Sequence, residues 1–63
     1  MQIKQVFEIL NLQPWVRISV RQHSPTGVIY LGGGHVDRVI RRFAEKEIVD
    51  TSVIDNILVI HVK

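Results

Sequence analysis

The spacing of the apolar residues switches from a helical to a strand period twice along the chain. A helical spacing over residues 3–10 is followed by the alternation that is typical of strands, and the same succession begins again at residue 36. Each helical segment precedes two short strand-like runs. The sequence therefore predicts the order α-β-β-α-β-β, in two similar halves.

The first helix is predicted from apolar side chains that share one helix face at i, i+3, i+4 and i+7: Ile3, Val6, Phe7 and Leu10. Asn11 and Pro14 should end it, because proline cannot continue the helical hydrogen bonds and biases the residue before it toward extended geometry. Trp15, which follows, is expected to close the end of the core beneath this helix.

The first hairpin is predicted from alternation over residues 15–21. Arg17, Ser19 and Arg21 should point to one side, opposite the apolar Val16, Ile18 and Val20. Residues 23–27 contain a proline and a glycine that favour a turn, and a second strand is expected over residues 28–31. The triplet 32–34 should break that strand and lead into the second helix.

The second half repeats this plan. Its helix is predicted from Val36 to about residues 44–46, with Asp37 in the first turn and basic side chains near the end, as the helix dipole prefers. Strands are expected over residues 48–54 and 57–62, joined at Asp55 and Asn56 by a primed turn that requires positive φ.

We expect residues 1–63 to form a single small α+β domain with two layers. Both helices should cover one face of a four-stranded, mainly antiparallel sheet. Apolar residues of the second hairpin are expected on the outer surface: Val49, Val53, Ile57 and Val59. Because a chain this short has little core and no cysteine for a disulfide, such a patch favours burial against another molecule, with a homodimer as the leading form.

Several classes of function lack the residues that they need. The chain has no cysteine, its three histidines are far apart in sequence, and its serines lack an evident base and acid. We therefore expect no catalytic residues, no metal site, no cofactor and no enzyme activity. No apolar run approaches the roughly 20 residues that span a bilayer, and the first residues lack the pattern of a signal peptide, so a cytoplasmic protein without membrane contact is expected.

Basic side chains provide the leading candidate for a binding surface. Six residues on the second helix and on the open side of the first hairpin are predicted to contact a protein partner: Arg17, Arg21, Tyr30, Arg38, Arg41 and Arg42. Nucleic acid is a weaker alternative, because the net charge is only +2 and two exposed aromatic candidates are too few for base stacking. A basic helix face that is simply solvated is the usual explanation of such a pattern, and it stays open beside both binding interpretations.

The glycine-rich turn provides another candidate, a site for a small anion or nucleotide: Gly32, Gly33, Gly34, His35 and Arg38. Backbone N–H groups at the start of a helix attract anions. Against this, the spacing of known phosphate-binding loops is missing, and Asp37 would repel a phosphate. The alternative is that three glycines only allow a tight reversal between sheet and helix.

Three segments carry a resemblance to known proteins: the opening helix from Ile3–Lys4 to Leu10–Asn11, the hairpin return over residues 26–30 and the closing strand over residues 56–62. In these segments the chain resembles a loose group of very short proteins that are encoded by phages and mobile elements of bacteria. The glycine triplet and the basic helix depart from the acidic middle segment that is typical of this group. The resemblance implies a small accessory protein that binds and modulates a host component, including inhibition of a bacterial defence system, and it transfers no catalytic residue.

Overall fold

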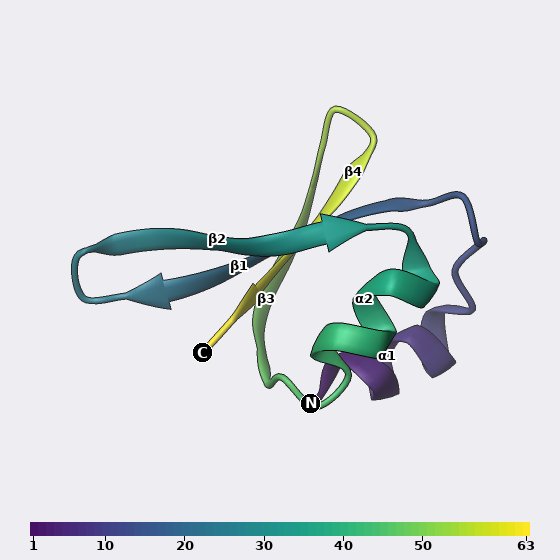
Figure 1. Ribbon diagram of the computed structural model, residues 1–63, viewed down its shortest axis with the longest axis horizontal. Coiled ribbons are helices and arrows are strands. Elements are labelled where there is room, and N and C mark those ends of the chain that lie inside the picture. Colours follow the sequence, from purple (N-terminus) through teal and green to yellow (C-terminus); the bar gives the residue numbers. More distant parts are fainter.

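The computed structural model describes all 63 residues and contains two helices and four strands in the predicted order (Figure 1). In chain order they are α1 (Ile3–Leu10), β1 (Arg17–Ser24), β2 (Gly27–Gly34), α2 (Val36–Phe43), β3 (Ile48–Ile54) and β4 (Ile57–Val62). The predicted α+β class is confirmed. Neither helix is long and apolar enough to cross a lipid bilayer.

The four strands form one mixed sheet in the order β2-β1-β4-β3. Each hairpin is antiparallel, whereas the two central strands are parallel, with Arg17 beside Ile57 at one end and Gln22 beside Val62 at the other. The sheet is therefore mainly antiparallel, as predicted, but its two halves are joined by parallel pairing. In Figure 1 the hairpins cross steeply, and the β1–β2 hairpin projects well beyond the helices.

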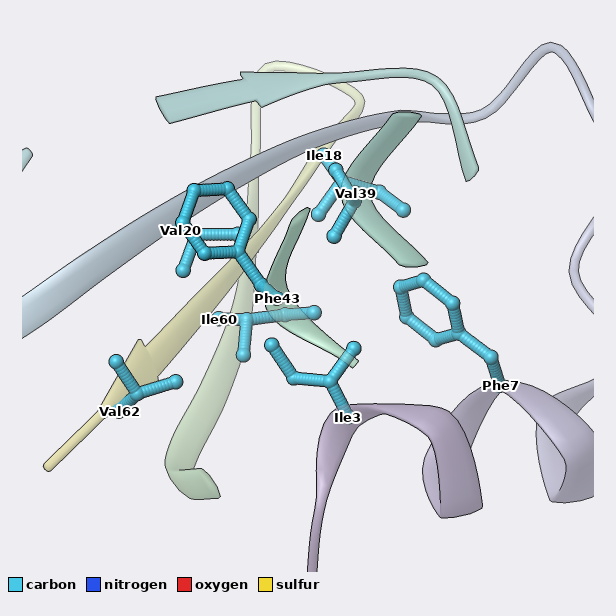
Figure 2. Packing of buried hydrophobic residues seen from close by; sticks show 8 residues of the cluster. All are labelled: Ile3, Phe7, Ile18, Val20, Val39, Phe43, Ile60 and Val62. Atoms are coloured by element: carbon cyan, nitrogen blue, oxygen red, sulfur yellow. The ribbon is translucent and has the colours of Figure 1, made fainter. Parts of the chain in front are cut away.

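Both helices pack against the same face of the sheet and bury one apolar core (Figure 2). Ile3 and Phe7 come from α1, and Val39 and Phe43 come from α2. They pack against β1 and β4 through Ile18, Val20, Ile60 and Val62. The apolar faces that the sequence predicts for the helices and for the strands thus pack against each other in one core.

The turns at Asn11 and at Asp55–Asn56 lie where the sequence predicts them, whereas the first hairpin turn is shorter than predicted, because β1 extends through Ser24 and β2 begins at Gly27. Asn11 adopts a left-handed conformation with φ of 49° at the end of α1, where its backbone N–H donates to the carbonyl of Phe7. Asp55 and Asn56 have φ of 51° and 64°, as a two-residue primed turn between β3 and β4 requires. The twist of such a turn matches the twist of the strands that it joins.

Two local predictions are wrong. The glycine triplet does not break the second strand, because β2 continues through Gly34 and pairs with β1 there. Trp15 does not close the core either: its side chain is 70% exposed, while Leu12 and Val16 pack against the core beside α1. Short apolar residues on both sides of the tryptophan fill that space.

Strand register places the expected outer apolar residues on different faces. Val59 lies beside Ser19 on the outer face, and Ile57 shares that face. Val53 instead lies opposite Leu58, which belongs to the helix-covered face, yet Val53 is 70% exposed because β3 is an edge strand beyond the helices. Residues that are paired in register lie on the same face of the sheet. Because both sides of the second hairpin are largely apolar in sequence, the sequence could not show which of these residues face outward.

Candidate functional site

The outer face of the sheet contains a groove of about 750 Å³ that no helix covers. It lies between the first half of β1, the junction of β2 with α2 and the turn between β3 and β4. Its lining combines arginines, one tyrosine and apolar strand residues: Arg17, Ile18, Ser19, Arg21, Tyr30, Gly34, His35, Asp37, Arg38, Ile54, Asp55, Ile57 and Val59. Three segments that are distant in sequence therefore form one concave surface.

Arg21 folds back along β1 toward the centre of this groove. Its Nε donates a hydrogen bond to Ser19 Oγ at 3.4 Å, and this contact is partly buried. Ser19 is the parallel neighbour of Val59, so the arginine side chain lies beside that valine. Val59 is only 1% exposed although it belongs to the outer face. The groove thus has an apolar floor with a guanidinium group next to it.

Tyr30 reaches the same point from the neighbouring strand. It lies opposite Arg21 in the β1–β2 ladder, and its hydroxyl is 3.1 Å from the position that a Cβ atom would take at Gly33. Gly33 in turn lies opposite Ser19. The polar groups of Arg21, Ser19 and Tyr30 therefore lie close together around the paired residues Ser19 and Gly33.

The arginines of the groove have no partner of opposite charge within the chain. The single salt bridge of the structure joins the Met1 ammonium group to Glu47, and neither residue lines the groove. Asp37 and Asp55 line the groove without forming an ion pair. Since a guanidinium group binds carboxylates and phosphates in a bidentate manner, these free arginines are suited to an anionic ligand.

Close packing explains the glycine triplet. A Cβ atom at Gly33 would lie 2.4 Å from the carbonyl oxygen of Ile18, which no side chain can do. A Cβ atom at Gly34 would meet Arg38 Cδ at 2.9 Å, so the stem of this arginine fills the space above the turn. The glycines thus allow close approach of backbone and side chains. A variant at Gly33 would disturb the sheet and could not test ligand binding.

The structure brings together most of the residues that the sequence predicts for binding. Residues from both predicted sites line the same groove: Arg17, Arg21, Tyr30, Gly34, His35 and Arg38. Gly32 and Gly33 do not line it. Arg41 and Arg42 lie elsewhere on α2, and the guanidinium of Arg42 lies 5.3 Å from the centre of the Phe43 ring. The protein-binding and anion-binding hypotheses therefore concern largely one surface.

The sequence predicts Ile57 and Val59 on the outer surface, but it does not predict their place beside the arginines, and it misses Ile54, Asp55 and one further contact. Ile54, Asp55 and Ile57 join the groove only because β4 pairs with β1, which no local pattern indicates. His23 and His61 lie side by side on the outer face, although large sequence spacing argued against any histidine site. No group of three or more histidine, aspartate or glutamate side chains is arranged to hold a metal ion.

Comparison of the chain with protein-family models, with curated proteins and with solved structures found no match.

Proposed function

We propose that the protein is an interaction module that binds an acidic segment of a partner protein in the groove. The observation that carries this proposal is the meeting of three unpaired arginines, Arg17, Arg21 and Arg38, in one concave surface. Binding rather than catalysis fits this lining, because the hydroxyl of Ser19 accepts a hydrogen bond from Arg21 and forms none with the histidine or the carboxylates of the groove, the groups that could act as a base.

The apolar floor favours a peptide over a bare inorganic anion. Ile54, which is 51% exposed, and the half-buried Ile57 line the groove together with the arginines and offer a place for one apolar side chain of a partner. Charged groups around such a floor fix the register of a bound segment, while the buried apolar contact adds affinity. A segment with acidic residues on both sides of a leucine or a phenylalanine matches this arrangement.

Fluorescence anisotropy with a short labelled peptide tests the proposal. The peptide carries glutamates around one leucine, and its counterpart carries lysines instead. We expect Arg21→Gln and Arg38→Gln each to weaken binding of the acidic peptide about tenfold or more, because each removes a charge-assisted hydrogen bond. Arg41→Gln is the matched control, since this arginine lies on α2 outside the groove.

Two outcomes would contradict the proposal. The first is equal binding of the acidic and the lysine peptide, and the second is loss of affinity in the Arg41 variant alone. Charge reversal at Arg41 and Arg42 together examines the helix face that the sequence also predicts for partner binding. Loss of binding in that double variant, with the groove variants unaffected, would move the site to α2.

A second candidate function is binding of a small anion or nucleotide at one end of the groove. Gly34, His35 and Arg38 lie together at the start of α2 and line this surface, which supports that reading. Thermal shifts with inorganic phosphate and with a panel of nucleotides distinguish it from the peptide hypothesis. An oligonucleotide competitor covers the nucleic-acid alternative, whose affinity would fall steeply with added salt.

The wider role that we propose is that of a cytoplasmic accessory protein of phage or mobile-element origin that modulates a host component. The resemblance to short proteins of this kind supports it, and inhibition of a bacterial defence system is one form of it. Expression in a bacterial host with an active defence system should raise the plating efficiency of a phage that the system restricts. Unchanged plating across several such systems would count against this role.

A further inference from the structure

Two histidines from separate halves of the chain meet on the outer face of the sheet. His23 lies near the end of β1 and His61 near the end of β4, 38 positions apart in sequence. The Nε2 atom of His23 and the Nδ1 atom of His61 are 2.9 Å apart. The ring centres are 4.7 Å apart, and the ring planes are nearly perpendicular at 88°. The parallel pairing of β1 with β4 creates this contact.

The separation of the two nitrogens suits a shared metal ion of particular geometry. With metal–nitrogen bonds of about 2.0 Å, nitrogens 2.9 Å apart subtend an angle of about 90° at the ion. A tetrahedral zinc site needs a wider spacing of about 3.3 Å. An angle near 90° is typical of the tetragonal sites of Cu²⁺ and Ni²⁺. We propose that His23 and His61 form a two-imidazole site for a divalent copper or nickel ion.

The proton between the two rings does not prevent this binding. In the metal-free pair, one ring nitrogen donates its N–H to the lone pair of the other. When an ion binds, small ring rotations turn both lone pairs toward it, and the donating ring carries its proton on its outer nitrogen instead. The neutral pair thus becomes a chelate without net loss of a proton.

The surroundings leave the ion accessible. His23 is exposed and His61 is half-buried, so water can complete the coordination. Arg21 lies beside His61 in β1, and Asp50 lies opposite His61 in β3, so one positive and one negative group flank this end of the site. The uncharged Val28 lies opposite His23 in β2. The two charges on the flanking strands offset each other near the ion.

The proposed site is separate from the groove. Neither histidine lines the groove, and Arg21 lies between the two surfaces along β1. Removal of either imidazole therefore leaves Arg17 and Arg38 in place, so metal binding and peptide binding can fail independently. The metal-site proposal therefore does not depend on the proposed function.

Titration with Cu²⁺ alone and with Ni²⁺ alone, followed by calorimetry, tests the proposal on the full 63-residue chain. Electron paramagnetic resonance of the Cu²⁺ complex should show coupling to two imidazole nitrogens. His23→Ala and His61→Ala should each abolish this signal and the one-to-one binding step. His35→Ala is the matched control, because His35 lies at the start of α2 and away from the pair, and it should bind as the parent chain does.

Three results would contradict the proposed metal site. Absence of a one-to-one step in the parent chain would do so, as would a step that persists in either single variant of the pair. Circular dichroism of each variant checks that the fold is retained, and His61→Asn provides a polar replacement if the alanine variant unfolds. Tighter binding of Zn²⁺ than of Ni²⁺ would contradict the assigned geometry.

Discussion

The ring of Phe43 lies directly over Gly32, so close that a Cβ atom on this glycine would be 3.2 Å from the ring Cζ atom. Gly32 also has a φ of +156°. Gly32→Ala should therefore displace the ring and strain the backbone at once, lowering the free energy of unfolding by roughly 2–4 kcal/mol. Urea denaturation measures this loss.

Gly27→Ala separates the two causes. Gly27 has a similar φ of +139°, but nothing lies within 4 Å of the position of its missing Cβ atom. The alanine there should cost only the backbone strain, on the order of 1 kcal/mol. Equal losses at the two positions would show that contact with Phe43 contributes nothing.

Ile3 should be one of the most sensitive residues in the chain. It is fully buried between α1 and the sheet, whereas Ile9 on the same helix is 68% exposed. Ile3→Ala should cost about 2–5 kcal/mol, a large part of the roughly 3–9 kcal/mol available to a domain of this size. Ile9→Ala should change stability by less than about 0.5 kcal/mol. Thermal unfolding of both variants gives the comparison, and similar melting temperatures would argue against the orientation of α1.

Glu47 should give the protein a small dependence of stability on acid pH. The hydrogen bond from the Met1 ammonium, its charge and the charge of Lys63 hold the pKa of this carboxyl below its ordinary value of 4.5. A lowered pKa in the folded state means that the stabilisation is present above pH 4.5 and is lost as the pH falls through the lowered value. Glu47→Gln should remove this part of the pH dependence in urea titrations. An unchanged acid profile would refute the pairing.

The exposed apolar residues of the edge strands should decide whether the protein self-associates. Val28 and Ile29 are about half exposed and lie at the start of β2, next to the turn of the first hairpin. This hairpin projects beyond the helices (Figure 1). If a second copy covers this edge, Ile29→Lys should shift the sedimentation profile from dimer to monomer with little change in folding. A lysine on an edge strand is the usual obstacle to strand pairing between copies. Dimers that persist in Ile29→Lys would place the contact elsewhere, with Val53→Lys on β3 as the corresponding test.

Local patterns were sufficient for nearly every element of this fold. The stripe through Ile3 and Phe7 marked α1, and the polar turn at Asp55 and Asn56 marked the second hairpin to the residue. The glycine triplet misled, because glycine favours turns in general but here continues a strand against close neighbours. Its role depends on Phe43 and Ile18, whose positions are set by tertiary packing.

The sequence pattern predicts only part of the candidate site. Arg17 and Arg21 alternate with buried residues, so their common face followed from the strand period. The strand period does not predict that Ile57 and Val59 line the same groove, because this depends on the parallel pairing of β1 with β4. The contact of His23 with His61 has the same origin.

That pairing also has a consequence for how the chain folds. Each hairpin can close early from local contacts, but the register of Arg17 with Ile57 joins strands from the two halves of the chain. Loop closure of this length is the slow step in small proteins, so docking of the two preformed halves should limit the folding rate. Residues of the central seam, above all Val20 and Ile60, would then carry the highest φ-values, and the tips of both hairpins would contribute only to the rate of unfolding.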